Sequence, residues 1–160
     1  MPDMKPNIGI NDKNLKEITN MLSAVLADSV VLYTKTRKFH WNVSGQSFME
    51  LHKLFETQYD KLAEAIDEIA ERISKLGALS IGTLKEFLQQ TSLKETPGKN
   101  PDQQGMLKEL LADHETVIKA LRKNIDDCED KFKDKGTADF LNNIMQQHET
   151  IAWTLRRYLR

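Results

Sequence analysis

Five side chains in the first half of the sequence have the types and the spacing of metal ligands. They are His40, His52, Glu56, Asp67 and Glu71. His52 and Glu56 are four residues apart, so they lie on one face of a helix, one turn apart. Asp67 and Glu71 have the same spacing. Imidazole nitrogens combined with carboxylate oxygens suit iron and disfavour soft Cu(I), although zinc or cobalt could compete. The pattern predicts a metal site held by helices.

These ligand positions share one stripe of a predicted helix, but they cannot all meet within one chain. At about 100° per residue, the other three helix positions lie within about 100° of His52. A helix rises about 1.5 Å per residue, so His52 and Glu71 are about 28 Å apart. If two copies of the helix pack antiparallel about a twofold axis, facing residues have numbers with a constant sum. His52 with Glu71 gives 123, and so does Glu56 with Asp67. We therefore expect two equivalent sites in each dimer.

The apolar residues of the same segment form a separate line. They step by three or four residues, and they are Phe48, Leu51, Phe55, Tyr59, Leu62, Ile66, Ile69, Ile73 and Leu76. This rhythm is typical of a helix in a bundle core. Its mean direction lies about 120° from the ligand stripe, so the ligands flank the core. Charged pairs at this spacing also occur on solvated helix faces, which is the competing interpretation.

Three short motifs contain the ligand residues. They read His40-Trp41-Asn42-Val43-Ser44-Gly45, Leu51-His52-Lys53-Leu54-Phe55-Glu56 and Ile66-Asp67-Glu68-Ile69-Ala70-Glu71-Arg72. Together they resemble the paired signatures of the Dps family of mini-ferritins. The resemblance implies that His40, His52 and Glu56 come from one subunit. It implies that Asp67 and Glu71 come from the twofold mate, in agreement with the constant sum.

The same resemblance implies a ferroxidase. Members of the Dps family oxidise Fe(II) to Fe(III) at dinuclear-type sites shared between two subunits. For this chain the oxidant is expected to be hydrogen peroxide or dioxygen. Family members store the ferric mineral in a hollow shell of twelve subunits and so protect against oxidative damage. Two positions depart from the usual pattern, since Glu56 is more often Asp and Ser80 is more often Pro or Ala. Neither departure removes a ligand.

Two further residues acquire predicted roles. Trp41 follows His40 directly, so it could pass an electron and quench radicals, although a Trp at the end of a bundle commonly serves packing. The resemblance implies that Asp139 lines the threefold pores through which iron enters the shell. Asp139 also belongs to an acidic region that is otherwise typical of a solvated helix end.

Helical periodicity dominates the chain and predicts an all-α fold. We expect one ferritin-like domain, residues 1–160, with a tail at 1–10, long helices at 11–40, 47–76, 101–129 and 137–159, and a short helix at 83–90. Capping boxes are predicted at Ser47–Glu50 and Thr83–Glu86, and an N-cap at Asn100. The connection between the second and third long helices is long enough to cross the bundle. The result is a ferritin-like four-helix bundle with a long crossover.

His114 and His148 fall on the core lines of the last two helices and raise a rival metal site inside the bundle. However, the usual intrabundle motif, Glu-x-x-His, is absent, because Leu111 and Met145 precede these histidines by three residues. Buried, hydrogen-bonded imidazoles are the preferred interpretation.

Composition limits the remaining classes. The formal net charge is -1, and Cys128 is the single cysteine, which excludes an internal disulfide and suits a reducing cytoplasm. No apolar run is long enough to span a bilayer, so no membrane is expected. A DNA-binding nucleoid protein is the alternative, yet residues 1–12 contain one lysine against two aspartates. The only basic cluster is Arg156, Arg157 and Arg160. A purely structural or signalling bundle is the other rival.

Overall fold

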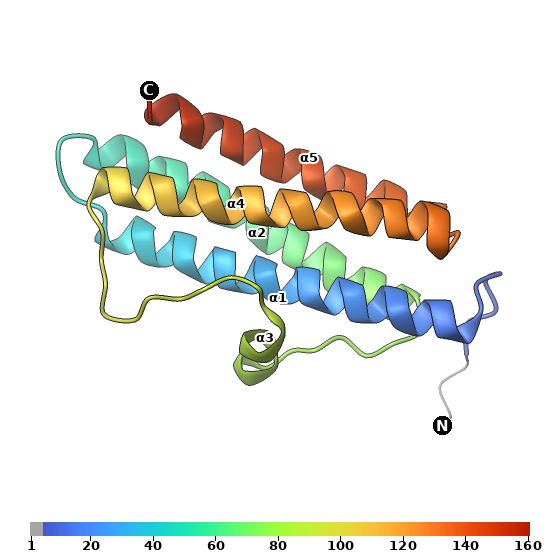
Figure 1. Ribbon diagram of the computed structural model, residues 1–160. Coiled ribbons are helices and arrows are strands. Elements are labelled where there is room, and N and C mark those ends of the chain that lie inside the picture. Colours follow the sequence, from blue (N-terminus) through green and yellow to red (C-terminus); the bar gives the residue numbers. More distant parts are fainter. Residues whose placement is uncertain (1–4) are drawn as a thin grey trace.

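The computed structural model describes residues 5–160, and all the regular structure of these residues is helical. Four long helices form a bundle (Figure 1): α1 (Asp12–Asn42), α2 (Phe48–Lys75), α4 (Gln103–Asp126) and α5 (Lys135–Tyr158). Two short elements are α3 (Leu84–Gln90) and a π-helical turn, η1 (Asp127–Lys131). The predicted all-α bundle is confirmed. The predicted tail, residues 1–10, lies partly outside the described residues, because the structure does not describe residues 1–4, which include Asp3.

Two hairpins and one crossover make up the topology. A tight turn joins α1 to α2, and another joins η1 to α5, so the helices of each hairpin are antiparallel. The connection from α2 to α4 contains α3 and runs back along α1 (Figure 1), so that α4 is parallel to α2. This is the crossover that the sequence predicts. Among the described residues, no helix combines the length and the apolar character that crossing a membrane requires.

Two buried charges of α1 fasten the crossover. The carboxylate of Asp28 accepts hydrogen bonds from the Thr91 hydroxyl (2.7 Å), the Ser92 amide (2.7 Å) and the Ser92 hydroxyl (2.9 Å). The Lys35 ammonium donates to the carbonyl oxygen of Lys94 (2.8 Å). Buried charges are stable only when they are paired or hydrogen-bonded, and both of these are. The crossover is therefore held against α1 by specific polar contacts.

The bundle core follows the predicted apolar lines. The α2 positions that are fully buried include Leu51, Phe55, Leu62, Ile69 and Ile73. Phe48 differs, with 39 % of its surface exposed, because it begins α2 and packs its ring on His52 instead (centroids 5.2 Å apart). His114 and His148 are buried in the core of α4 and α5.

Several helix starts differ from the sequence prediction. The N-cap of α4 is Asp102, whose side chain accepts from the Gly105 amide at 2.8 Å, and not Asn100. Ser47 precedes α2 but makes no side-chain capping bond, so the capping box predicted there is wrong. The box at Thr83–Glu86 is present. A short polar side chain caps a helix when it reaches a free backbone amide of the first turn. Sequence spacing alone does not decide which of several neighbouring polar residues does so.

The turn between the last two helices also differs. The α-helical part of α4 ends at Asp126, before the predicted end at 129, and η1 continues it. Asp134 caps α5 by accepting from the Thr137 amide (3.0 Å), so α5 begins two residues before the predicted start at 137. Within this turn, burial raises the pKa of the Cys128 thiol to about 12, with smaller contributions from Asp134 and Asp127. That thiol is a poor nucleophile.

Candidate metal centre

The turn between α1 and α2 brings two of the predicted ligands together. His40 lies in the last turn of α1, and His52 lies near the start of α2. Gly45, in the turn between them, has φ +112°, and a Cβ there would lie 3.1 Å from the Gln103 side chain. Glycine therefore permits the tight reversal that places the two imidazoles side by side. Their ring centroids are 3.7 Å apart, with 16° between the planes.

Reciprocal hydrogen bonds fix both rings. His40 Nδ1 lies 2.7 Å from the His52 carbonyl oxygen, and His52 Nδ1 lies 2.9 Å from the His40 carbonyl oxygen. A carbonyl oxygen can only accept, so each Nδ1 carries a proton and donates it. In the neutral imidazole, each Nε2 then keeps an unprotonated lone pair. Both rings are oriented and held in the tautomer that can bind a metal ion through Nε2.

The three carboxylates divide between the two halves of α2. Glu56 is half-buried and lies one helical turn beyond His52. Asp67 and Glu71 are exposed in the C-terminal half of α2, where Glu71 pairs with Lys75 at 3.7 Å. Fifteen helical residues separate His52 from Asp67, or about 22 Å. Within one copy of the described residues, no three His, Cys, Asp or Glu side chains are close enough to hold a metal ion.

An aromatic cluster that the sequence analysis did not predict lies beside His40. The ring of Tyr59 meets the ring of His40 edge to face, with centroids 5.2 Å apart. Burial raises the pKa of the Tyr59 phenol, and the charge of Glu56 raises it further. The sequence placed Tyr59 on the apolar core line, because its spacing fits that line. The spacing of Tyr33 and Arg37, which are four residues apart on α1, was the available signal for the cluster.

Among the described residues, the ring of Trp41 does not contact either histidine ring, and Asp139 lies on another helix. Trp41 is 64 % exposed, and its ring contacts the Arg37 guanidinium at 5.3 Å. Asp139 is exposed on α5. Because α5 begins at Lys135 and not at the predicted residue 137, Asp139 lies just beyond the first turn of this helix.

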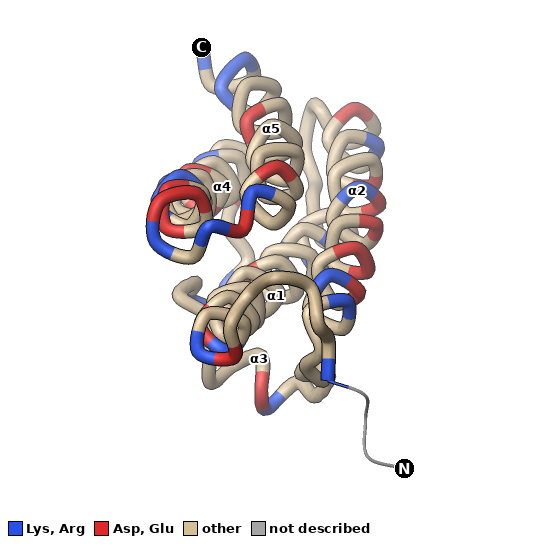
Figure 2. The backbone as a smooth tube through the Cα atoms, turned by 90° about the vertical axis from the view of Figure 1, so that its right-hand side faces the viewer, with Lys and Arg blue, Asp and Glu red and all other residues tan. Residues whose placement is uncertain are grey.

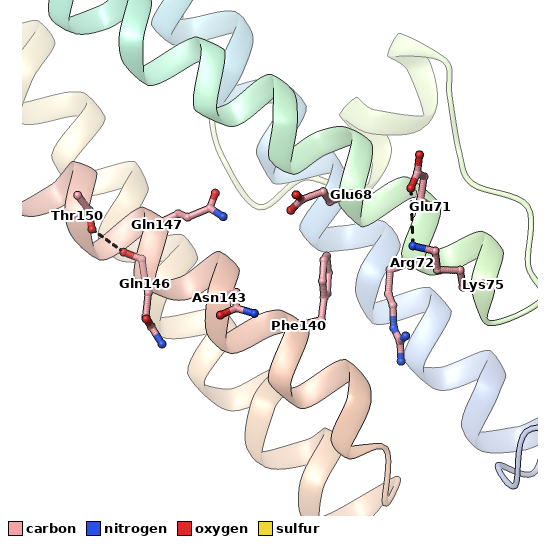
Figure 3. Close-up of a pocket in the computed structure, with 9 residues that line it drawn as sticks. All are labelled: Glu68, Glu71, Arg72, Lys75, Phe140, Asn143, Gln146, Gln147 and Thr150. Atoms are coloured by element: carbon pink, nitrogen blue, oxygen red, sulfur yellow. Dashed lines mark hydrogen bonds and ion pairs between the residues drawn. The ribbon is translucent and has the colours of Figure 1, made fainter.

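A polar groove separates the C-terminal half of α2 from α5 (Figure 3). Its volume is about 730 Å³, and its lining residues are Glu68, Glu71, Arg72, Lys75, Phe140, Asn143, Gln146, Gln147 and Thr150. At one end, Arg72 Nε and Nη2 donate to the Thr137 hydroxyl at 3.1 and 2.9 Å, and Nη2 lies 3.5 Å from Asp134. Arg72 therefore ties the part of α2 that carries Asp67 and Glu71 to the start of α5.

Comparison with known proteins gives the family. The ferritin-like domain family matches residues 19–160. DNA protection during starvation protein 2 of Bacillus anthracis is 36 % identical over 90 % of this chain and 97 % of that protein. The chain belongs to the Dps family of ferritin-like proteins. A low temperature-induced protein of Nostoc sp. PCC 7120 is 47 % identical over 96 % of this chain and 86 % of its own.

Solved structures agree with this assignment. The crystal structure of the Dps protein from Vibrio cholerae superposes with a TM-score of 0.91, at 28 % identity, and covers the whole of both chains. Its description places that protein in a broad superfamily of ferritin-like diiron-carboxylate proteins. The predicted ferritin-like fold of the present chain is thereby confirmed.

Proposed function

We propose that this Dps protein oxidises Fe(II) to Fe(III) at sites shared between two subunits and stores the product as a ferric mineral. In this proposal, His40, His52 and Glu56 of one subunit face Asp67 and Glu71 of its twofold mate. The shell has twelve subunits, works in the cytoplasm and protects the cell from oxidative damage. Ferrous iron is the substrate, and hydrogen peroxide is the preferred oxidant, with dioxygen as the other candidate.

The reciprocal hydrogen bonds between His40 and His52 are the observation that carries this proposal. They leave the Nε2 lone pairs of both rings available in the same place, so that metal binding would need no change in the conformation of the two side chains. The two rings are stacked and nearly parallel, an arrangement that suits one imidazole on each of two neighbouring ions better than two imidazoles on one ion. Pairs of metal ions in such sites lie about 3.5–4 Å apart. Carboxylates from a second copy would neutralise their charge.

The reaction balances with two ferrous ions at one site. Each ion gives one electron to a hydrogen peroxide molecule, and the O–O bond breaks. Two protons from solvent then complete two water molecules. The role of the protein is to hold both reductants beside one oxidant, so that peroxide is reduced by two electrons without releasing a radical.

The test uses the assembled protein under anaerobic conditions. Fe(II) is added, followed by hydrogen peroxide, and ferric absorbance and particle size are recorded. We expect rapid oxidation and iron-filled particles of unchanged outer size. The matched control is His52→Ala, which should oxidise iron at least about tenfold more slowly, as for other losses of a metal ligand or its support. Equal rates in the two proteins, or ferric precipitate outside the particles, would contradict the proposal.

A further inference from the structure

Four side chains beside the candidate centre form a compact aromatic cluster: Tyr33, Arg37, Trp41 and Tyr59. Tyr59 contacts His40 edge to face at 5.2 Å, with 81° between the rings. Tyr33 contacts Tyr59 in the same manner at 6.1 Å and 89°. The cluster therefore reaches the predicted ligand His40 through the Tyr59 ring.

Arg37 occupies the middle of this cluster. Its guanidinium carbon lies 4.7 Å from the Tyr59 ring centre, 5.6 Å from that of Tyr33 and 5.3 Å from that of Trp41. Arg37 Nη1 also donates a hydrogen bond to the Tyr33 hydroxyl at 2.7 Å. Among the described residues, the ring contacts of His40 are with His52 and Tyr59, and none is with Trp41. Tyr59 is thus the oxidisable side chain that touches a predicted ligand.

If the proposed ferroxidase function is correct, a site that holds a single ferrous ion cannot complete the reduction of hydrogen peroxide by itself. One Fe(II) supplies one electron, so reduction of hydrogen peroxide would stop at hydroxide and a hydroxyl radical. A second electron must come from the protein before the radical escapes. A phenol can provide it as a hydrogen atom, leaving a neutral phenoxyl.

We propose that Tyr59 supplies this second electron. The O–O bond of peroxide breaks, Fe(II) becomes Fe(III), and one oxygen leaves as hydroxide. The other oxygen takes the hydrogen atom of the Tyr59 hydroxyl and leaves as water, so Tyr59 becomes a phenoxyl radical. The next Fe(II) to bind gives one electron to this radical, a solvent proton restores the phenol, and the total is again two ferrous ions for each peroxide.

The positive charge of Arg37 favours the neutral phenoxyl radical as the oxidised form of Tyr59. A positive charge about 5 Å away opposes the formation of a second positive charge on the same rings, because like charges repel strongly where water is partly excluded. A neutral phenoxyl carries no such charge. The cluster therefore favours hydrogen-atom loss from a tyrosine over a radical cation on Trp41.

Freeze-quench electron paramagnetic resonance tests the assignment. The assembled protein is loaded anaerobically with one Fe(II) for each predicted site, mixed with hydrogen peroxide and frozen. We expect a tyrosyl signal whose splitting collapses when ring-deuterated tyrosine is incorporated. The signal should be lost in Tyr59→Phe and should disappear when a second Fe(II) is added to the wild type. The matched control is Tyr158→Phe, which changes the remaining tyrosine, at the C-terminal end of α5, and should leave the signal intact.

Other outcomes separate this inference from the proposed function. With two Fe(II) for each site, the wild type should oxidise iron without a tyrosyl signal, because no protein electron is needed. A radical that survives in Tyr59→Phe and is lost in Trp41→Phe would overturn the Tyr59 assignment, as would the absence of any protein radical in the wild type. If the wild type fails to oxidise iron at either loading, the ferroxidase proposal itself fails.

Discussion

Each histidine at the turn between α1 and α2 uses one ring nitrogen for the fold and leaves the other for a ligand. The sequence identified His40 and His52 as candidates because their types and neighbours fit a metal site. It could not predict the exchange of hydrogen bonds between them, since that depends on how closely the two helix ends approach. For the same reason Trp41 received a predicted redox role, whereas Tyr59 was assigned to the apolar core line. Sequence adjacency places Trp41 next to His40, but in the single chain its side chain is exposed and contacts Arg37.

His40→Ala should separate ligand chemistry from packing. The substitution removes one Nε2 and one hydrogen bond to the His52 carbonyl, so we expect oxidation of Fe(II) at least about tenfold slower, with roughly 1 kcal/mol lost from the free energy of unfolding. His114→Ala should do the opposite. It leaves a cavity in the core, which typically costs about 2–5 kcal/mol, while oxidation continues. Initial oxidation rates and melting temperatures of both variants are measured together. The candidate centre is wrong if His114→Ala abolishes oxidation and His40→Ala does not.

The buried histidine pair should make the bundle sensitive to acid. His114 and His148 lie with their Nδ1 atoms 2.9 Å apart, and the buried Nε2 of each ring has no hydrogen-bond partner among residues 5–160. Burial lowers the pKa of His148 to about 4. It also lowers the pKa of His114 well below the usual range, and the neighbouring His148 adds to that shift. The unfolded chain, with an ordinary pKa near 6.5, takes up protons first, so stability falls as the pH drops from about 6.5 towards 4.

A double variant measures this effect. Replacing both histidines, as His114→Leu with His148→Leu, removes the titrating groups and the shared N–H together. The pKa shift of His148 by itself should make the wild type lose roughly 2 kcal/mol more of its free energy of unfolding than the double variant loses between pH 7 and pH 5. This corresponds to about 4–8 °C in melting temperature for a chain of this size. Melting temperatures of the two proteins are compared at both pH values, and equal losses would rule out the pair as the cause.

At the scale of the helices, periodicity predicted the elements better than it predicted their ends. The apolar line of α2 marks its buried side correctly because burial requires a repeat of three or four residues. The ends depend on single contacts. Asp102 and Asp134 cap α4 and α5, whereas the sequence predicted an N-cap at Asn100 and a helix start at residue 137. The π-helical turn η1 has no comparable sequence signal and remained unpredicted.

Of the two aspartates near the start of α5, Asp134 should contribute more to the stability of the fold than Asp139. It is buried, caps the Thr137 amide and lies beside Arg72. We expect Asp134→Ala to lower the free energy of unfolding by about 2 kcal/mol, because it removes a cap and leaves Arg72 without its carboxylate. Asp139→Ala is the matched control on the same helix. Asp139 is exposed, so its removal should change stability by less than about 0.5 kcal/mol. Chemical denaturation of both variants gives the comparison, and equal losses would contradict the capping role.

At the scale of the whole molecule, acidic side chains recur along the helices of the described residues, whereas a basic cluster, Arg156, Arg157 and Arg160, lies at the C-terminus. Red acidic positions recur along α2 (Figure 2), which carries the predicted carboxylate ligands. Of the C-terminal arginines, Arg156 already pairs with Glu115 at 2.9 Å, and Arg157 packs over Trp153. The basic cluster is thus partly used within the chain. A sequence cannot show this pairing, because Glu115 lies on another helix.

Duplex DNA should therefore bind weakly. Any binding should rely on the arginines at the end of α5, so affinity should fall steeply as salt rises. Arg156, Arg157 and Arg160 changed together to Ala should reduce it further. Fluorescence anisotropy with a labelled duplex at two salt concentrations measures both effects. Tight binding that survives high salt and the triple substitution would show that another surface contacts DNA.

The twofold arrangement makes a prediction that a single chain cannot satisfy. His52→Ala and Asp67→Ala each remove one predicted ligand from every site, so each homogeneous protein should be nearly inactive in iron oxidation. In a mixed dimer, one site receives both lesions and the other site receives neither, because the two halves of each site come from different subunits. Subunits mixed before assembly should consequently regain part of the wild-type rate, with about one intact site in each mixed dimer. Differently tagged subunits, purified in sequence after the shells have been dissociated to dimers, confirm that the dimers are mixed. If such dimers stay inactive, His52 and Asp67 do not face each other across a twofold axis.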